Sequence, residues 1–354
     1  MNAKVCRSST EIRPLQPSLP EAALHRLRLC VSRGLATGEP WDAALAYGAP
    51  GDVVSALGRY WLEGFEPGRQ PLLSAPWFTT ELHGSECGFV HARAAERDAR
   101  ACLLLHGYSG SPAELMVDAL SLVEGAPGDA CHVVCPSLPG FGLSSESASV
   151  EAIAEGYATL MARLGYSRYL IHGSDLGASI ALRLAALDAA HVTGVHVTAL
   201  PAYPGEAPEA MGGLSSAEKS QLARLSELHD ELGFLLPETP LEELAFALAR
   251  LEHDTDVTEL AERLLTGLTL SWTLGCRDAR AELYRRARLA TAPRTSVPVS
   301  FHGFPLDAPV LRRFAEARHQ VVDWREHERG GPMPGLEQPA LLLQSLREFA
   351  RSLS

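Results

Sequence analysis

An aspartate placed between two glycines is the strongest chemical signal in the sequence. Residues 170–172 are apolar and strand-like, and they lead through residues 173–177 (Gly-Ser-Asp-Leu-Gly) straight into a helical pattern. This tight strand-to-helix turn is a nucleophile elbow that carries Asp175 where serine esterases carry serine. The turn holds its central residue in a strained conformation and leaves no room for neighbouring side chains, so it needs the glycines. The pattern predicts an exposed carboxylate nucleophile at Asp175, beside a helix N-terminus whose dipole favours the negative charge.

Two other loops favour this interpretation over the simpler alternative, in which Asp175 only caps the following helix. Residues 106–111 (His-Gly-Tyr-Ser-Gly-Ser) follow one predicted strand, and their backbone amides, with that of Tyr108 first, can form an anion hole together with the amide of Leu176. Residues 136–144 form a rigid turn after the next strand. His106 ends a buried strand and is expected to be a hydrogen-bonded structural histidine. Ser174 lies one residue from the tip of the elbow and is expected to point elsewhere.

The elements that must position these loops alternate regularly from residue 101 onward. Short apolar, β-rich runs predict strands over residues 101–106, 131–135, 169–172, 192–198, 297–302 and 321–324. Apolar residues at helical spacing predict helices over about 151–164, 177–190 and 337–353. Strands that alternate with helices indicate an α/β fold with a mostly parallel sheet covered on both faces.

Two regions fall outside this alternation and define four predicted segments. Residues 1–100 contain helices and then a hairpin-like stretch over 77–84, which indicates an N-terminal extension. Residues 205–290 are helical and leucine-rich, and they interrupt the core formed by residues 101–204 and 291–354. An insertion at the carboxyl ends of parallel strands is placed to act as a lid over a site.

Composition excludes several classes of function. The 31 Lys and Arg residues are outnumbered by 43 Asp and Glu residues, for a formal net charge of −12, so a nucleic-acid binder or a protein docked on an anionic membrane is not expected. No apolar run reaches the roughly 18 residues of a membrane span, and the N-terminus lacks the apolar core of a signal peptide. The seven cysteines are scattered without metal-site spacing, which favours free thiols, no metal and a cytoplasmic location.

With these motifs in place, the sequence resembles the microsomal-type epoxide hydrolase family of α/β-hydrolase-fold enzymes over nearly its whole length. The resemblance rests on several motifs in the right order. These are the aromatic N-terminal segment that ends at residues 77–84, the H-G-x-x-G loop at 106–110, the C-P-S-x-P-G-x-G loop at 135–142, the Asp elbow, and the W-T-x-G segment at 272–275.

The family's roles carry over to three side chains. Asp175 falls at the nucleophile that attacks an epoxide carbon and forms an alkyl-ester intermediate. Tyr284 falls at a lid tyrosine that hydrogen-bonds the epoxide oxygen, and Asp307 falls at the acid that orients the catalytic histidine. The alternatives are a half-buried lid tyrosine and an aspartate that starts a helix over 309–318.

The resemblance also implies a ligand of a particular kind. It implies a hydrophobic small-molecule substrate of the epoxide class and no cofactor, and it allows a homo-oligomer. An apolar lid fits such a substrate, although these residues are more often lid core: Leu235, Leu236, Leu241, Leu244, Phe246 and Leu248.

The main departure from the family lies before the last helix. Family members carry R-G-G-H-F there, and this chain reads Arg-Gly-Gly-Pro-Met over residues 329–333. Pro332 occupies the position of the histidine that activates water, and proline can neither accept nor donate a proton. Glu337 and Pro339 hold the alignment in register. His302 and His327 are expected to be packed or surface residues, and His319 is expected to be solvated.

Three hypotheses of function follow from the retained and lost residues. The first is an epoxide hydrolase in which a substitute base activates water. The second is a non-hydrolytic cyclase or isomerase of specialised metabolism, in which Asp175 acts as base or electrostatic stabiliser and Tyr284 as acid. The third is a catalytically impaired binding protein. A dehalogenase is weaker, because it would need the same missing histidine.

Overall fold

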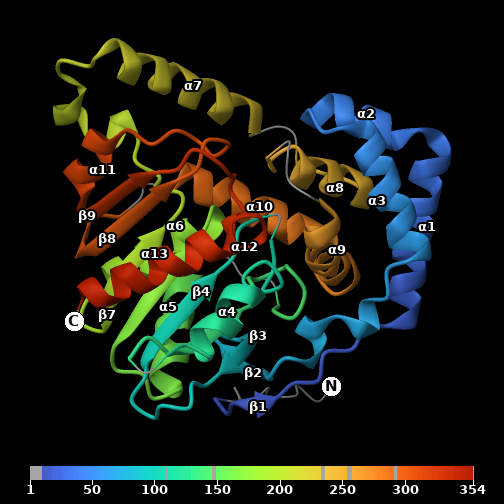
Figure 1. Cartoon of the computed structure of the whole chain (residues 1–354), viewed down its shortest axis with the longest axis horizontal. Helices are drawn as coiled ribbons and strands as arrows, with labels where there is room; N and C mark the ends of the chain where they lie inside the picture. The colour runs from blue at the N-terminus through green and yellow to red at the C-terminus, as the bar shows by residue number, and fades with distance from the viewer. Residues whose placement is uncertain are drawn as a thin grey trace, which may run out of the picture.

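A nine-stranded sheet forms the centre of the computed structural model, which describes residues 10–353 except 109, 127, 146–148, 233–235, 253–256 and 291–292. The strand order is β1-β2-β3-β5-β4-β6-β7-β8-β9. Strands β4 to β9 run parallel to one another, whereas β1, β2 and β3 extend the sheet with antiparallel pairs (Figure 1). This is the expected α/β-hydrolase fold, with a mostly parallel sheet.

The six parallel strands occur where apolar runs predicted them. Their bounds are β4 Arg100–Leu105, β5 Cys131–Pro136, β6 Tyr169–Gly173, β7 Val192–Val197, β8 Thr295–Gly303 and β9 His319–Glu326. Along β4, Leu103 and Leu105 belong to the core on one face of the sheet, and Cys102 and Leu104 to the core on the other face. Such strands carry almost continuous apolar residues because both faces are buried.

Helices cover both faces of the sheet. Helices α5 (Val150–Arg163) and α6 (Leu176–Leu187) pack on one face, and α4 (Met116–Val123) and α13 (Pro339–Ser352) pack on the other (Figure 1). Short helices α11 (Arg312–Arg318) and α12 (Pro334–Glu337) lie in the C-terminal part of the chain. The alternation of strand and helix thus places the carboxyl ends of the parallel strands along one edge of the core.

The first hundred residues contribute helices and also strands of the sheet. The strands are β1 Arg13–Pro14, β2 Trp77–Leu82 and β3 Ser85–Ala92, and β2 and β3 form the expected hairpin. The helices are α1 Glu21–Thr37, α2 Glu39–Tyr47 and α3 Gly51–Glu63, followed by 3-10 turns η1 Pro67–Arg69 and η2 Pro71–Ser74. The N-terminal residues therefore belong to the same sheet as the core and also form a separate helical layer.

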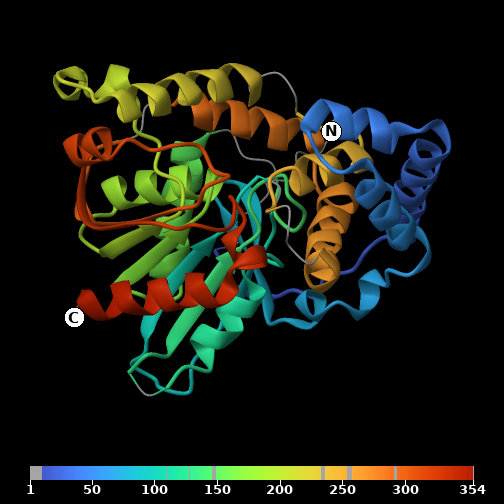
Figure 2. The ribbon, with the colours of Figure 1, turned by 45° about the horizontal axis from the view of Figure 1, so that its top comes forward.

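The segment between β7 and β8 is helical, as the leucine-rich pattern predicted. It contains η3 Pro204–Glu206, η4 Pro208–Met211, α7 Ser216–Leu232, α8 Pro240–Leu248, α9 Val257–Thr273 and α10 Arg277–Leu289. In Figure 2, α7 and α10 lie across the top of the view, above the strands, and α8 and α9 lie beside α1–α3. Helices α8 and α9 thus pack against the N-terminal helices, whereas α7 and α10 lie over the strands.

A second hydrophobic core joins the N-terminal helices to the inserted ones. Val54, Leu57 and Trp61 of α3 pack with Leu241 and Leu244 of α8. Leucines of the predicted lid therefore serve mainly as core: Leu248 belongs to this cluster too, Leu236 packs partly on the main core, and Leu235 lies outside the described residues.

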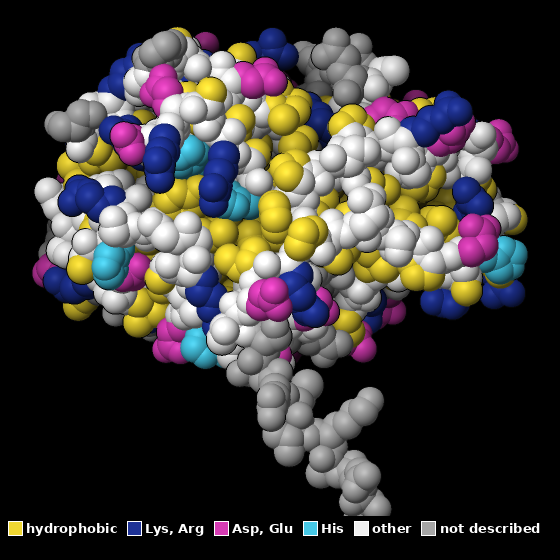
Figure 3. Space-filling model, turned by 90° about the horizontal axis from the view of Figure 1, so that it is seen from below, with side chains coloured by type: hydrophobic (Ala, Val, Ile, Leu, Met, Phe, Trp, Pro, Cys, Tyr) yellow, Lys and Arg dark blue, Asp and Glu magenta, His cyan; other side chains and the backbone are white. Residues whose placement is uncertain are grey.

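The surface shows charges of both signs. On the face in Figure 3, Lys and Arg side chains are interspersed with Asp and Glu side chains and with hydrophobic ones. Within the described ranges, every helix is too short or too polar to cross a membrane.

Candidate active site

Asp175 sits at the sharp turn between β6 and α6. Its backbone has φ 46° and ψ −114°, a strained conformation for a residue that is not glycine. A Cβ atom at Gly173 would lie 2.5 Å from the carbonyl oxygen of Gly177, and one at Gly177 would lie 2.3 Å from that of Leu105. The two glycines flanking the turn are therefore required by close backbone approach, as the elbow pattern predicted.

The loop over residues 106–111, called the oxyanion loop below, contacts the Asp175 carboxylate directly. The backbone N–H of Tyr108 donates a hydrogen bond of 2.9 Å to Oδ2 of Asp175. Leu176 is the first residue of α6, so its amide lies at the helix N-terminus next to Asp175. Ser109 of the same loop lies outside the described residues. One carboxylate oxygen is thus fixed by the backbone, while Asp175 also lines a cavity.

His106 has the structural role that the sequence suggested. It is fully buried, its Nδ1 lies 2.9 Å from the carbonyl oxygen of Gly107, and its Nε2 accepts a 3.0 Å hydrogen bond from the N–H of Leu138. Burial lowers the pKa of His106 to about 4. A neutral imidazole therefore ties the oxyanion loop to the 136–144 turn.

Ser174 points away from the cavity, also as expected. Its hydroxyl is buried and donates a 3.3 Å hydrogen bond to Oε1 of Glu114, which lies behind the elbow. Burial raises the pKa of Glu114 to about 8. The serine next to the nucleophile position thus supports the elbow from the protein interior.

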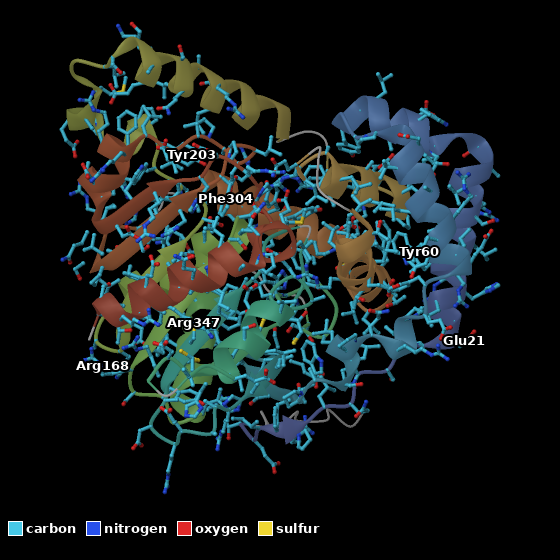
Figure 4. The ribbon with its side chains drawn as sticks, in the orientation of Figure 1. Glu21, Tyr60, Arg168, Tyr203, Phe304 and Arg347 are labelled. Atoms are coloured by element: carbon cyan, nitrogen blue, oxygen red, sulfur yellow. The ribbon has the colours of Figure 1, made fainter. Side chains whose placement is uncertain are left out.

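A cavity of about 310 Å³ brings Asp175, Tyr284 and Asp307 together. Apolar side chains from four parts of the chain form much of its wall, and they include Ala46, Leu200, Phe246, Ala287 and Val310. Tyr203 also lines the cavity, and Figure 4 shows it in the region between α7 and the sheet. Among the described residues of the predicted apolar lid, Phe246 is the one that lines the cavity.

Tyr284 projects from α10 into this cavity and is 3% exposed. Its ring centroid lies 4.7 Å from that of Tyr108. Burial, and secondly the charge of Asp175, raise the pKa of Tyr284. The phenol therefore stays protonated at neutral pH and is able to donate a hydrogen bond to a ligand.

Asp307 follows β8 and lines the cavity with one oxygen unpaired. Its Oδ1 accepts a 2.7 Å hydrogen bond from the N–H of Ala308, and its buried Oδ2 has no hydrogen-bond partner among the described residues. Burial raises the pKa of Asp307 to about 7, with Arg250 lowering it and Asp175 raising it. The helix that follows begins at Arg312, so Asp307 is not its cap.

Arg250 is a cavity residue that the sequence did not single out. Its Nη2 lies 3.7 Å from Oδ1 of Asp175, and its guanidinium lies 5.1 Å from the ring centroid of Phe246. An arginine just past the apolar helix α8 looks like an ordinary cation at a helix C-terminus. No local signal therefore distinguished it, and only the tertiary structure places it beside Asp175.

Pro332 is buried and is not part of the cavity wall. The neighbouring Gly331 donates a 2.8 Å hydrogen bond to Oε2 of Glu337, and a Cβ at Gly331 would lie 2.2 Å from the carbonyl oxygen of Arg250. Oε1 of Glu337 accepts a further bond of 2.7 Å from the N–H of Glu252. The segment that carries Pro332 thus packs against the backbone at Arg250.

The cavity wall contains no histidine among the described residues. His302 is buried, with Nε2 3.0 Å from Oδ2 of Asp323 and Nδ1 3.0 Å from Nε2 of His327. The ring of His327 stacks on Phe304, which Figure 4 places near the end of β8. Both histidines are packed within the C-terminal half of the sheet, as expected.

The prediction that His319 is solvated is wrong. This histidine is buried at the start of β9, and its Nδ1 lies 3.2 Å from Oγ1 of Thr295. The sequence suggested a solvated side chain because His319 precedes the predicted strand over 321–324, but β9 begins at His319 and its pairing with β8 buries the side chain. No cluster of three or more His, Cys, Asp or Glu side chains suited to a metal ion occurs within the described part of the chain.

The chain is similar to known proteins over nearly its whole length. The family model described as "Alpha/beta hydrolase family" matches residues 102–345, and the one described as "Epoxide hydrolase N terminus" matches residues 12–115. The chain is 30% identical to "Putative epoxide hydrolase" of Stigmatella aurantiaca (strain DW4/3-1), over 97% of this chain and 85% of that protein. It is 24% identical to Epoxide hydrolase 1 of Sus scrofa, over 96% of this chain and 88% of that protein.

Two solved structures share the fold. The Aspergillus niger epoxide hydrolase has a TM-score of 0.77 and 24% identity, over 98% of each chain. The juvenile hormone epoxide hydrolase from the silkworm Bombyx mori has a TM-score of 0.78 and 20% identity, over 98% of this chain and 96% of that chain. With its N-terminal segment, its sheet and its Asp elbow in the family's order, this chain belongs to the microsomal-type epoxide hydrolase family of the α/β-hydrolase fold.

Proposed function

We propose that this protein opens the epoxide ring of a hydrophobic small molecule by nucleophilic attack of Asp175. The observation that carries the proposal is the position of this carboxylate. It lies at a strained elbow, one oxygen accepts the Tyr108 N–H, and the residue lines a cavity together with a buried phenol. A carboxylate so placed is suited to attack an electrophilic carbon.

The chemistry uses two side chains in the first step. An oxygen of Asp175 forms a bond to one epoxide carbon, and the carbon–oxygen bond of the ring breaks. Tyr284 donates its proton to the departing alkoxide, which leaves a hydroxyl group beside the new ester. In the second step, water adds to the ester carbonyl, and the Tyr108 N–H stabilises the oxyanion that develops on Oδ2.

The apolar wall supports a hydrophobic substrate. Leu200, Phe246 and Val310 offer no hydrogen bonds from their side chains, so the binding free energy comes mainly from the burial of apolar surface. The inserted helices α8 and α10 supply Phe246 and Tyr284, which fits the predicted role of residues 205–290 as a lid.

The test is a comparison of matched variants with two hydrophobic epoxides, styrene oxide and 1,2-epoxydodecane. Asp175→Asn is expected to lower the rate of epoxide consumption by about a thousandfold or more, because the amide is not a nucleophile. The exposed Asp52→Asn is the control and should match the wild type. Tyr284→Phe is expected to slow ring opening about a hundredfold, while Tyr203→Phe, which alters another tyrosine of the cavity, has a small effect.

Product analysis separates this proposal from its alternatives. A diol as product of the wild type supports it. A cyclic ether or isomer from a hydroxy-epoxide, with no solvent oxygen, would point to a cyclase. A raised melting temperature with no product from any epoxide would point to a binding protein.

A further inference from the structure

Asp307 lines the cavity without the partner that its position implies. In the family that the chain resembles, this acid orients a histidine, but Pro332 occupies the histidine position, and the cavity wall contains no histidine among the described residues. Oδ1 of Asp307 is held by the N–H of Ala308, and its buried Oδ2 has no hydrogen-bond partner in the described part of the chain. The carboxyl group is thus fixed at one oxygen and available at the other.

We propose that Asp307 itself exchanges the protons of the reaction: it supplies the proton of ring opening through Tyr284, and it is the base that activates water against the Asp175 ester. This inference rests on the proposed function, because it needs the ester. It requires Asp307 to be protonated before ring opening and ionised afterwards.

The charges around Asp307 support the protonated form before reaction. Burial raises the pKa of Asp307 to about 7, Arg250 lowers it, Asp175 raises it, and Arg288 lowers it. Tyr284 lines the same cavity and is neutral, since its own pKa is raised. At neutral pH a large share of Asp307 therefore carries a proton, and a group whose pKa is near the working pH is best suited to move one.

Ring opening changes this balance in the direction that hydrolysis needs. Formation of the ester removes the negative charge of Asp175, and that charge is one of the causes that raise the pKa of Asp307. The guanidinium of Arg250, 3.7 Å from Oδ1 of Asp175 in the free site, then has one carboxylate fewer to neutralise. Both effects favour ionised Asp307 while the ester is present.

The protons balance over the cycle. In the first step Asp175 bonds to carbon, Tyr284 gives its proton to the alkoxide, and protonated Asp307 returns the phenol to its neutral form. In the second step ionised Asp307 takes a proton from water as the water oxygen bonds to the ester carbonyl carbon. The bond between that carbon and the alkyl oxygen breaks, and the proton on Asp307 passes to the departing alkoxide. The carboxyl group of Asp175 then ionises, and its proton restores Asp307.

The experiment follows both steps by intact-protein mass and by diol release in single turnovers with styrene oxide and 1,2-epoxydodecane. In Asp307→Asn the ester on Asp175 should form more slowly than in the wild type, because the amide cannot return a proton to Tyr284, and it should then persist, with hydrolysis slowed about 10² to 10⁴-fold. Asp307→Glu should restore part of this rate. His253→Gln serves as a comparison, because His253 follows Arg250 closely in the sequence and lies outside the described residues.

The pH dependence of the wild type tests the same claim without any variant. Ring opening should slow as pH rises above about 7, where free Asp307 loses its proton. Hydrolysis of the ester should slow only at a pH clearly below 7, where Asp307 gains a proton, because loss of the Asp175 charge lowers the pKa of Asp307 while the ester is present. If Asp307 had only a structural role, neither of these two pH dependences would occur. Both should be absent from Asp307→Asn.

Three results would overturn the inference. If Asp307→Asn discharges the ester at the wild-type rate and with the wild-type pH profile, Asp307 is not the base, while the adduct itself still supports Asp175 as nucleophile. If His253→Gln, and not Asp307→Asn, traps the ester, the base is that histidine. If the wild type forms neither adduct nor diol with either epoxide, the proposed function fails together with this inference.

Discussion

Gly177 is the residue on which the position of Asp175 depends most directly. A Cβ atom there would lie 2.3 Å from the carbonyl oxygen of Leu105 and 2.7 Å from that of His106. Both oxygens belong to backbone that cannot rotate away, so the elbow or β4 would have to move. The same contact that makes the turn tight also makes it intolerant of a larger residue.

Gly177→Ala is therefore expected to lower the free energy of unfolding by about 3 kcal/mol, as overpacking of backbone does. Gly205→Ala is the matched control, because a Cβ at Gly205 meets no atom within 4 Å, and its free energy of unfolding should stay near that of the wild type. Urea denaturation of both variants measures the difference. Equal stability of the two would contradict the close packing at the elbow.

At this scale the sequence predicted the residues with distinctive local patterns and missed those without them. Asp175 was predictable because its flanking glycines mark the elbow, and His106 because it ends a buried strand. Arg250 was not, because its proximity to Asp175 arises only from the tertiary structure, which brings the residue after α8 to the elbow. The lack of a partner at Oδ2 of Asp307 was equally invisible, since it depends on burial.

At the scale of elements, helix α3 holds α9 through one large side chain. Trp61 is 4% exposed, and its Nε1–H donates a 2.9 Å hydrogen bond to Oγ1 of Thr269. Leu57 and Val54 of the same helix pack in the same core, which also contains residues of α8. Helix α8 leads to Arg250, so the N-terminal helices help to fix the wall of the cavity.

Trp61→Ala is expected to cost about 3 to 5 kcal/mol of unfolding free energy, because it leaves a cavity and an unpaired hydroxyl at Thr269. Trp41→Ala on α2 is the control, since Trp41 is 62% exposed, and it should cost less than about 1 kcal/mol. Chemical denaturation of the two variants gives both values. A small loss in Trp61→Ala would show that the inserted helices do not depend on α3.

The sequence predicted the strands better than the helical layers. Parallel strands buried on both faces are apolar throughout, so their positions are visible in short windows. The packing of α3 against α8 and α9 joins residues about two hundred positions apart, and nothing in the local pattern reports it. For the same reason, the hairpin-like stretch over residues 77–84 could be predicted, whereas the place of β2 and β3 in the main sheet could not.

At the scale of the whole molecule, buried acids and buried histidines make the free energy of unfolding change with pH in opposite directions. Burial raises the pKa of Glu114 and of Asp118 to about 8 and that of Asp307 to about 7. Their unfolded values are near 4, so the folded state holds protons that the unfolded state has lost. The contribution of these acids to the free energy of unfolding is therefore largest below about pH 4, and it decreases as pH rises toward 8.

Buried histidines act in the other direction. Burial lowers the pKa of His106 and His319 to about 4 and that of His172 to about 3, and it also lowers the pKa of His196 and His302. The pKa of histidine in the unfolded chain is near 6.5. The contribution of these histidines to the free energy of unfolding is therefore largest above that pH, and it decreases as pH falls toward 4. The two groups together place maximum stability near pH 6.5.

The melting temperature is therefore expected to be highest near pH 6.5 and to decline on both sides. Asp118 is a suitable probe of the alkaline side, because its buried carboxyl oxygens have no hydrogen-bond partner among the described residues. Asp118→Asn should reduce the decline between pH 6.5 and 8, while exposed Asp52→Asn should leave it unchanged. A melting temperature that rises steadily to pH 8.5 in the wild type would contradict this assignment.

The central claim is that Asp175 forms a covalent bond to the substrate, and one isotope measurement tests it most directly. Excess protein is allowed a single turnover of styrene oxide in water enriched in oxygen-18, and both the diol and the peptide that contains Asp175 are then weighed. We expect one solvent oxygen on Asp175 and none in the diol, because water attacks the ester carbonyl and the diol takes its new oxygen from the carboxylate. Solvent oxygen in the first diol, with Asp175 unlabelled, would show that water opens the ring directly and would contradict the account.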